Sequence, residues 1–402
     1  MAPEMHMLGT VLLAVAAVLL SLPAVAMLVL TLAAGKRNAA SAPKYRVQSR
    51  LRVAVLVPAH NESQNVLPTI ACLLPQMRQG DRLVVVADNC SDDTAQIARG
   101  AGATVVERHN TELRGKGYAL AFGVDSLRAD PPDVVMVVDA DCTVTSTAVE
   151  RVSAHCMQTG CPVQMLNLMQ AGPGSSVRLR ILEFAFVMKN MVRPLGSHRL
   201  GGACHLTGTG MALPWDLMST AQLATGHIVE DMKLGVDMAI RGHPAQFYLD
   251  AKVSSAFPDD SQVARVQKSR WEHGHLATQM EEFPRVAWAA LRSGQPALYV
   301  LTLDLMIPPL ALYALVLGAG LTLASAGSLL WPLLVPAAAI LAAATLAFIG
   351  SVGLTWSRYG RHLLSTRELL AIPIYAIWKI PVYLAYFMRR HSGWVRTKRD
   401  SE

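Results

Sequence analysis

The chain has 402 residues, of which 52% are hydrophobic and 16% are charged, and its mean hydropathy is +0.32. This composition is too apolar for an ordinary soluble enzyme, yet the chain is long enough for one full domain plus membrane segments, so we expect an integral membrane protein. The net charge of +7 is modest, and Lys and Arg cluster beside the apolar segments, which indicates orientation in a membrane and argues against nucleic acid as a partner.

The first predicted element is a membrane anchor. A stretch of 27 residues from Leu8 to Ala34 carries no charge and is long enough to span a bilayer. Basic residues follow at once, beginning with Lys36 and Arg37, whereas a cleavable signal peptide would carry its positive charge before the apolar run. We therefore expect an anchor with its amino end outside and its basic side in the cytoplasm.

From Arg52 onward, short apolar runs alternate with helical stretches, a pattern typical of βαβ units around a largely parallel sheet. The predicted elements are strand Val53–Val57, helix 64–79, strand Leu83–Ala87, helix Asp92–Arg99, strand Thr104–Glu107 and strand Val134–Val138. A dinucleotide-binding fold would carry GxGxxG in the first turn between strand and helix. That turn reads Pro58-Ala59-His60-Asn61-Glu62-Ser63, so a Rossmann dehydrogenase is excluded.

The last of these strands leads into two carboxylates separated by one residue, Asp139 and Asp141. Its unbroken apolar run predicts a strand buried on both faces. Acids at the carboxyl end of a central strand lie where open α/β sheets bind ligands, and closely spaced carboxylates suit a hard divalent cation that would hold a phosphate. The simpler alternative is a solvated acidic turn.

Two further positions in the same sheet are candidates for nucleotide contacts. Asp88 ends the second strand, where an acid commonly accepts hydrogen bonds from a base or ribose, although an isolated acid there is more often a turn or helix-capping residue. Lys116 lies between Gly115 and Gly117, which let the backbone approach a phosphate while the ammonium points at it. Alone this motif is weak, and its value comes from its position before Asp139.

The middle of the chain supplies a glycine-rich stretch and an acidic pair. Small residues are dense over 201–210, which indicates either a wall against which a backbone or substrate packs, or a plain loop. Glu230 and Asp231 open a predicted helix. There they can serve chemistry, or they can simply stabilise the helix amino end.

The next segment combines residue types that bind phosphates and sugars. Arg270 offers a planar donor array for phosphate oxygens and Trp271 a stacking face for a sugar ring, shortly after Gln267. The spacing of apolar residues near 283–292 then predicts an interfacial helix on the membrane.

Two further spanning helices are predicted at Leu298–Ala324 and Leu329–Trp356, followed by the basic residues Arg358 and Arg361. A last apolar stretch, 369–388, contains two prolines and a lysine and precedes a basic tail. If this stretch spanned the membrane, the basic tail would be exported, so we expect a re-entrant or interfacial hairpin with the tail inside.

These motifs, in this order, resemble the membrane-bound family 2 glycosyltransferases, the group of cellulose, hyaluronan and chitin synthases and of ceramide glucosyltransferase. The resemblance covers Val53 to about His275. The matching segments are Val57-Pro58-Ala59-His60-Asn61-Glu62 and Asp88 for the nucleoside, Asp139-Ala140-Asp141 for the DxD metal motif, Glu230-Asp231 for the end of the TED motif, and Gln267, Arg270 and Trp271 for QxxRW. Val229 departs from the family, which usually has Thr there.

The resemblance implies an α/β GT-A fold with a Rossmann-like sheet, a cytoplasmic catalytic domain, and transmembrane and interfacial helices. It implies that Mg²⁺ or Mn²⁺ is held by Asp141 with Asp139 beside it, and that Asp231, next to Glu230, is the catalytic base. The implied donor contacts are Pro58, Ala59, Glu62, Asp88, Lys116 and Asp139, and the implied diphosphate and acceptor contacts are Gln267, Arg270 and Trp271.

We therefore predict an inverting, metal-dependent hexosyltransferase of a bacterial-type inner or plasma membrane. Its donor would be a UDP- or GDP-linked sugar, and its acceptor a hydroxyl of a polyprenol-linked saccharide or a lipid, in surface polysaccharide or glycolipid synthesis. The alternative is a processive synthase, for which about three spanning helices offer little material for a channel. A transporter is disfavoured because the chemistry is concentrated in one soluble block.

The expected organisation has five parts. They are an anchor at 1–36, a cytoplasmic GT-A domain at 50–260, the QxxRW segment with interfacial helices at 261–296, two transmembrane helices at 297–357, and a hairpin with a basic cytoplasmic tail at 358–402.

Overall fold

The computed structural model describes residues 2–36, 51–224, 229–257 and 261–388, without the side chains of 2–8, 261–273 and 385–388. The chain folds into two units. The first, here called the sheet unit, comprises the described residues of 51–174 and 201–298. The second, the helical unit, comprises 2–36, 175–200 and 299–388.

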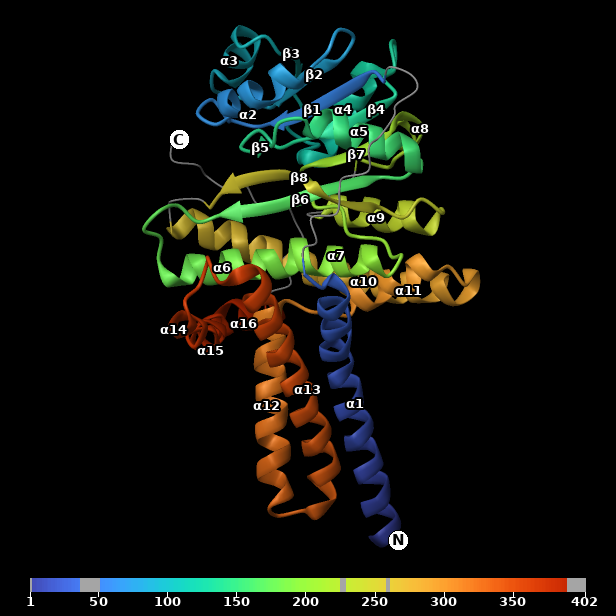
Figure 1. The fold of residues 1–402 in the computed structure, drawn as a ribbon, viewed down its shortest axis with the longest axis vertical. Coiled ribbons are helices and arrows are strands. Elements are labelled where there is room, and N and C mark those ends of the chain that lie inside the picture. The colour runs from blue at the N-terminus through green and yellow to red at the C-terminus, as the bar shows by residue number, and fades with distance from the viewer. Residues whose placement is uncertain (1, 37–50, 225–228, 258–260, 389–402) are drawn as a thin grey trace. The chain divides into compact units, whose positions relative to one another are not determined.

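A mixed eight-stranded sheet, in the order β3-β2-β1-β4-β7-β6-β8-β5, forms the centre of the sheet unit (Figure 1). The strands are β1 (Val53–Ala59), β2 (Arg82–Asp88), β3 (Thr104–Arg108), β4 (Val134–Val137), β5 (Thr143–Val144), β6 (Val163–Gln170), β7 (Met211–Pro214) and β8 (Gln246–Ala256). Strands β1 to β4 are parallel, whereas β7 runs antiparallel to both β4 and β6. The sheet therefore has a parallel half and a mixed half.

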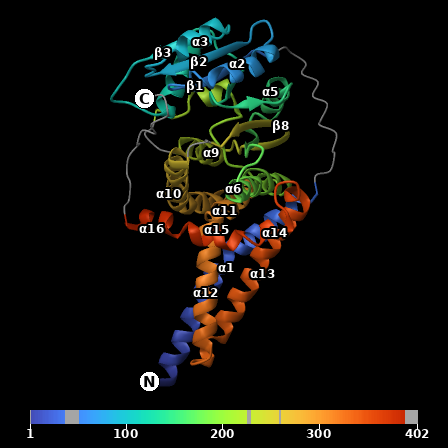
Figure 2. The same ribbon diagram turned by 90° about the vertical axis from the view of Figure 1, so that its left-hand side faces the viewer.

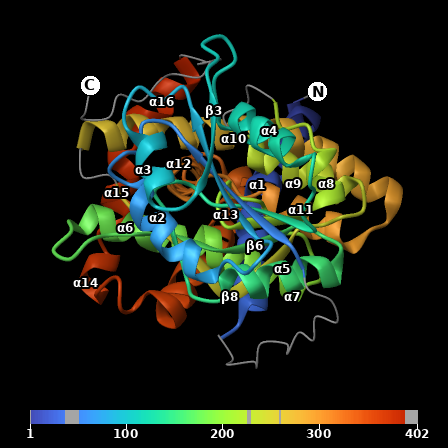
Figure 3. The same ribbon diagram turned by 90° about the horizontal axis from the view of Figure 1, so that it is seen from above.

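Helices cover both faces of the parallel half, which explains its continuous apolar runs. Val55 and Val57 of β1 share a core with Ile70 of the helix α2 (Val66–Leu73). On the other face, α4 (Lys116–Leu127) comes so close that a Cβ on Gly123 would lie 2.8 Å from Val86 Cγ2. Seen from above, α2 and α4 flank strands β1 to β3 (Figure 3). The remaining helices of this unit are η1 (Leu74–Gln76), α3 (Thr94–Gly100), α5 (Ala148–Thr159), α8 (Trp215–Ser219), α9 (Glu230–Ile240) and α10 (Ser261–Ser293).

The predicted parallel sheet and its intervening helices are confirmed. The helix predicted at 64–79 is shorter, because it tightens into η1 at Pro75 and ends at Gln76. The mixed half, built from β5 to β8, has no counterpart among the predicted elements. These strands pair with partners distant in the sequence, so local periodicity carries little signal for them.

The helical unit contains three helices long and apolar enough to cross a membrane, at Gly9–Ala34, Leu310–Ser328 and Pro332–Gly360. They belong to α1 (Ala2–Ala34), α12 (Leu310–Ser328), and α13 (Val335–Thr355) with its flanking η3 (Pro332–Leu334) and η4 (Trp356–Gly360). Figure 2 shows the three running side by side. The other helices around this unit are α6 (Val177–Val187), η2 (Met188–Val192), α7 (Arg193–Arg199), α11 (Pro296–Leu305), α14 (Thr366–Leu369), α15 (Ile372–Trp378) and α16 (Ile380–Met388).

Prolines account for two features of the apolar segments. The expected span Leu298–Ala324 is interrupted, because α11 ends at Leu305 and α12 begins only after Pro308 and Pro309, which have no amide hydrogen for a helix. The stretch 369–388 forms the short helices α15 and α16, each with a proline at its second position. Neither is long enough to span a bilayer.

The segment Ser175–Leu200 belongs to the helical unit although it interrupts the sheet unit in sequence. Ile181, Phe184 and Met188 pack in one core with Met27 and Leu30 of α1. A buried ion pair adds to this, since Arg193 Nε lies 2.6 Å from Asp304 Oδ1 with both side chains about 5% exposed. The amphipathic spacing of the apolar residues in this segment predicts a buried face. It does not predict that this face packs against α1, a candidate membrane-spanning helix.

Candidate functional site

The carboxyl ends of the parallel strands bring the predicted nucleotide-binding residues to one edge of the sheet. Pro58 and Ala59 lie at the end of β1, in register with Val86 and Ala87 of β2. Asp88 is the last residue of β2, and Asp139 follows β4 by two positions. Parallel register therefore gathers positions 58–62, 88 and 139, as such sheets do at ligand sites.

Lys116 is the cation at the centre of this edge. It begins α4 after Gly115, whose φ of 128° is a conformation that favours glycine. Its Nζ lies 2.5 Å from Asp139 Oδ1 and donates a hydrogen bond of 2.8 Å to the carbonyl of Gly208. Burial alone would lower the pKa of Lys116, but the carboxylates of Asp139 and Glu230, and then Asp231, raise it above its ordinary value. Lys116 is therefore a permanent positive charge.

The glycine-rich stretch packs directly against the catalytic candidates. A Cβ on Gly208 would lie 3.0 Å from Asp231 Oδ2 and 3.0 Å from Lys116 Nζ. The next residue, Thr209, accepts a hydrogen bond of 3.1 Å from the Asp139 amide through its hydroxyl. Of the two readings of 201–210, the described geometry favours the packed wall, because Gly208 lets Lys116, Asp139 and Asp231 converge.

Glu230 and Asp231 form the first turn of α9. The amide of Met232 donates a hydrogen bond of 2.8 Å to Asp231 Oδ1, while the other oxygen points to Gly208. Burial, followed by the adjacent charge of Asp231, raises the pKa of Glu230 to about 7, although Lys116 opposes this shift. The two acids thus share an environment that disfavours a second negative charge.

The residues after β4 suit a hard divalent cation. Asp139, Asp141 and Cys142 each offer one ligand atom, and these atoms lie within 4.8 Å of one another. Burial and then the neighbouring carboxylates raise the pKa of Cys142, so the thiol stays protonated and is a poor ligand. Partial loss of hydration and then the charge of Asp139 raise the pKa of Asp141, whose side chain still reaches solvent. A cation would relieve this repulsion, so the two carboxylates fit Mg²⁺ or Mn²⁺.

The nucleoside candidates are held by buried polar contacts. Glu62 is 8% exposed; its amide donates a hydrogen bond of 2.8 Å to Thr94 Oγ1, and Oε2 accepts one of 2.9 Å from Asn65. Asp88 forms an ion pair of 2.6 Å with Arg108. Arg108 is absent from the residues predicted from sequence, although the parallel register of β2 and β3 pairs it with Asp88.

Gln267, Arg270 and Trp271 lie on α10, but their side chains are outside the described residues. The later half of α10 is described, and there the buried Glu282 accepts from Arg285 and faces Lys233 of α9 at 3.5 Å. These ion pairs connect α10 to the helix that begins with Glu230 and Asp231.

In the same part of α10, Val286 and Ala290 of the predicted interfacial face are buried, whereas Leu291 is 68% exposed.

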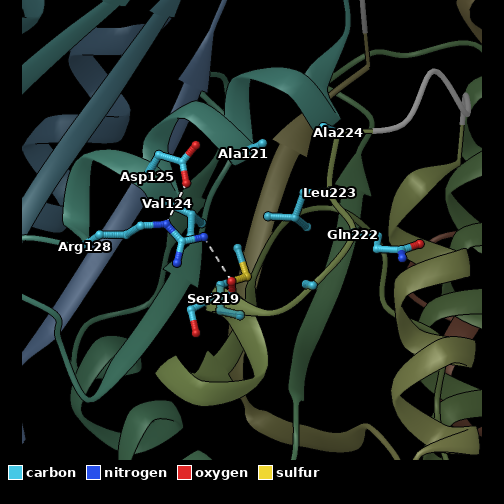
Figure 4. A pocket seen from close by; sticks show the side chains of 10 residues that line it. Ala121, Val124, Asp125, Arg128, Ser219, Gln222, Leu223 and Ala224 are labelled. Carbon is cyan, nitrogen blue, oxygen red and sulfur yellow. Dashed lines mark hydrogen bonds and ion pairs between the residues drawn. The ribbon is translucent and has the colours of Figure 1, made fainter.

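A cavity of about 300 Å³ lies between α4 and the segment after α8 (Figure 4). Arg128 crosses its edge, donating to Asp125 Oδ1 at 2.8 Å and to the Ser219 carbonyl at 3.1 Å. The lining residues are Ala121, Val124, Asp125, Arg128, Met218, Ser219, Ala221, Gln222, Leu223 and Ala224. Lys116, Asp139 and Asp231 do not line this cavity, so it is separate from the candidate site.

A family model described as "Glycosyltransferase like family 2" matches residues 50–274, more than half of the chain. The chain belongs to glycosyltransferase family 2. Its matched range contains the sheet edge, the glycine-rich stretch, both acidic pairs and the QxxRW residues. The resemblance inferred from the motifs is therefore confirmed at the level of the family.

The curated glycosyltransferases that the chain resembles are distant in sequence. The chain is 26% identical over 196 residues to 4,4'-diaponeurosporenoate glycosyltransferase of Staphylococcus haemolyticus, covering 46% of this chain and 50% of that protein. It is 24% identical over 247 residues to the probable glycosyltransferase YdaM of Bacillus subtilis, covering 58% of each chain. The chain thus spans about half the length of these relatives.

A solved mannosyltransferase structure extends the likeness over most of the chain. The mannosyltransferase PcManGT from Pyrobaculum calidifontis, in complex with GDP-Man and Mn²⁺, aligns with a TM-score of 0.55 at 19% identity and covers 91% of this chain and 98% of that one. Together with the family match, this likeness confirms the predicted GT-A fold with its additional helices.

Replacing Gly208 by alanine should disable the site without unfolding the protein. The new Cβ would push against Asp231 and Lys116, and the φ of 76° is unfavourable for alanine. We expect the turnover of a nucleotide sugar per folded protein to fall about a hundredfold, the loss typical of a misplaced catalytic group. Gly174→Ala is the matched control, because Gly174 has a φ of 77° and open space around it. Equal losses in both variants would contradict the assigned role of Gly208.

The raised pKa of Glu230 predicts a pH-dependent stability. A carboxyl with a raised pKa stabilises the fold while protonated, so its contribution is complete below the ordinary value of 4.5 and is lost as the pH rises through about 7. Glutamine carries no charge at any pH, so Glu230→Gln should not lose this stability when the pH rises. The variant should therefore gain thermal stability relative to the parent protein between pH 5 and about pH 8. Thermal unfolding of detergent-solubilised protein measures it, with the exposed Glu281→Gln as control. Parallel pH profiles of Glu230→Gln and parent would refute the expectation.

Proposed function

We propose that the protein is an inverting glycosyltransferase that moves a sugar from a UDP- or GDP-linked donor to a hydroxyl of a membrane-associated acceptor. The observation that carries this proposal is the convergence of Lys116, Asp139 and Asp231 around Gly208 at the ligand-binding edge of a family 2 sheet. A cation, a paired carboxylate and a second acid side by side are the groups needed to receive a diphosphate and to remove a proton.

The proposed donor site runs along the sheet edge. Asp88 would accept a hydrogen bond from the nucleoside, with Pro58, Ala59 and Glu62 forming the adjacent wall. Asp141 and Asp139 would hold Mg²⁺ or Mn²⁺, which supplies charge neutralisation to the diphosphate when bound. Lys116, already charged and fixed by two partners, would stabilise the negative charge that develops on the leaving nucleoside diphosphate.

Asp231 is the proposed catalytic base. It would accept the proton of the acceptor hydroxyl while the hydroxyl oxygen forms a bond to the anomeric carbon and the bond to the diphosphate breaks. A single displacement of this kind inverts the configuration. Gln267, Arg270 and Trp271 would position the acceptor and the diphosphate, and Glu230 would accompany Asp231 in the same helix turn.

The acceptor is proposed to lie in the membrane. The three candidate spanning helices and the basic residues beside their ends, such as Lys36, Arg358 and Arg361, support a plasma-membrane enzyme with its sheet unit in the cytoplasm. A polyprenol-linked saccharide or a lipid is the acceptor class that fits this placement.

Asp231→Asn should abolish sugar transfer, with a loss of about 10²–10⁴-fold typical for a missing general base, while donor binding survives. Turnover is measured as release of nucleoside diphosphate by detergent-solubilised protein supplied with a panel of nucleotide sugars, Mg²⁺ or Mn²⁺, and total membrane lipids. Asp141→Ala should remove the metal dependence together with the activity. The exposed Asp216→Asn, on α8, is the control. Near-normal turnover of Asp231→Asn would refute the base, and inactivity of the parent protein with every donor would refute the function.

A processive polysaccharide synthase is the alternative. Three candidate spanning helices in the described chain give little material for a polymer channel within one chain, which favours single addition. The length of the labelled product separates the two: one added sugar per acceptor supports the proposal, and a ladder or a high-mass polymer supports the synthase.

A further inference from the structure

The buried pair of Asp88 and Arg108 is the strongest feature that the proposed mechanism leaves unexplained. Both side chains are 10% exposed, and Arg108 Nη1 lies 2.6 Å from Asp88 Oδ1. In contrast, Arg99 and Glu107, the residue next to Arg108, form an ion pair with side chains 51% and 39% exposed. Removing two charges from water costs free energy. A buried ion pair beside the ligand-binding edge of the sheet therefore suggests a functional role.

Arg108 uses its other groups to hold the loop that carries Lys116. Its Nη2 donates a hydrogen bond of 2.6 Å to the carbonyl of Leu113. Its guanidinium carbon lies 5.7 Å from the ring centroid of Tyr118, which stands in the first turn of α4, two residues after Lys116. The guanidinium group of Arg108 therefore connects the end of β2 to both the loop before α4 and the start of that helix.

The hydrogen bonds on Asp88 are arranged in a way that suits a ligand. Oδ1 accepts from Arg108 and also from Asn89 Nδ2 at 3.0 Å. Within the described part of the chain, Oδ2 accepts no hydrogen bond. The pair therefore fixes the orientation of the carboxylate and leaves one oxygen as an acceptor for an N–H or O–H group of a nucleoside.

We propose that Arg108 is a positioning residue that sets the distance between the nucleoside end of the donor site, at Asp88, and the diphosphate end, at Lys116. This rests on the proposed function, because both ends are assigned to a nucleotide-sugar donor. Arg108 contacts protein groups at both ends and acts on the donor through them. Its loss should weaken donor binding and leave the proton transfer at Asp231 intact.

The test compares Arg108→Gln, Arg108→Lys and the matched control Arg99→Gln in full-length detergent-solubilised protein. For Arg108→Gln we expect the KM for the nucleotide sugar and the Kd for the free nucleoside diphosphate to rise about tenfold to a hundredfold, the effect of losing a hydrogen bond to a charged group, with a smaller fall in kcat because Lys116 also faces the leaving diphosphate. Lysine keeps the charge beside Asp88 but cannot also reach Leu113 and stack on Tyr118, so Arg108→Lys should recover part of the loss. Arg99→Gln should keep the parent KM.

A double-mutant cycle separates positioning from general structural support. If Arg108 acts in part through Asp88, Arg108→Gln should raise the KM less in the Asp88→Asn background than in the parent protein. Fully additive losses, equal effects of Arg99→Gln, or a fall in kcat with unchanged KM and Kd in the Arg108 variants would overturn the proposal. If Arg108→Gln does not fold, the Arg108→Lys variant decides by the same KM and Kd criteria. Active parent protein with unaffected Arg108 variants rejects only this inference, whereas an inactive parent that binds no nucleoside diphosphate rejects the proposed function with it.

Discussion

The ammonium group of Lys116 is the contact on which the candidate site depends. It bonds to Asp139 after β4 and to the Gly208 carbonyl, and the absent side chain of Gly208 admits Asp231 of α9. Burial and then repulsion from the neighbouring carboxylates raise the pKa values of Asp141 and Glu230, which lie in this group with Asp139 and Asp231. Among the described side chains Lys116 is the cation that faces these four carboxyls, and the excess of negative charge is the electrostatic condition under which a divalent cation binds.

The parallel half of this site was predictable because its signals are local. Strands β1, β2 and β4 are short apolar runs, each followed by or ending on a polar residue, and parallel pairing brings those ends to one edge. Asp88, Lys116 and Asp139 could therefore be selected from the sequence alone. Arg108 could not be selected in this way. A charged residue at the end of a short strand is normally expected to be exposed to solvent, and only the register between β2 and β3 places Arg108 beside Asp88.

The other half depends on contacts that no local pattern encodes. Lys116 and Gly208 are 92 residues apart, and β7 inserts between β4 and β6 although it follows β6 by some 40 positions. Between them the chain leaves the sheet unit for Ser175–Leu200, whose apolar stripe packs against α1. Amphipathic spacing reveals that a stripe is buried but not its partner, so the membership of α6 and α7 in the helical unit needed the structure.

The charged contacts between α9 and α10 bear on how the chemistry is organised. Glu282 of α10 is almost fully buried and pairs with both Lys233 of α9 and Arg285, and Arg285 also bonds to Asp237 of α9. A buried acid held by two cations resists separation of the helices, because pulling them apart would leave Glu282 unpaired. The proposed base lies at the start of α9, and Gln267, Arg270 and Trp271 lie in the earlier half of α10. These ion pairs thus join the two helices away from both of those ends. The proposed donor contacts lie on the sheet edge, whereas the proposed base lies on α9, which these charged contacts hold against the later half of α10.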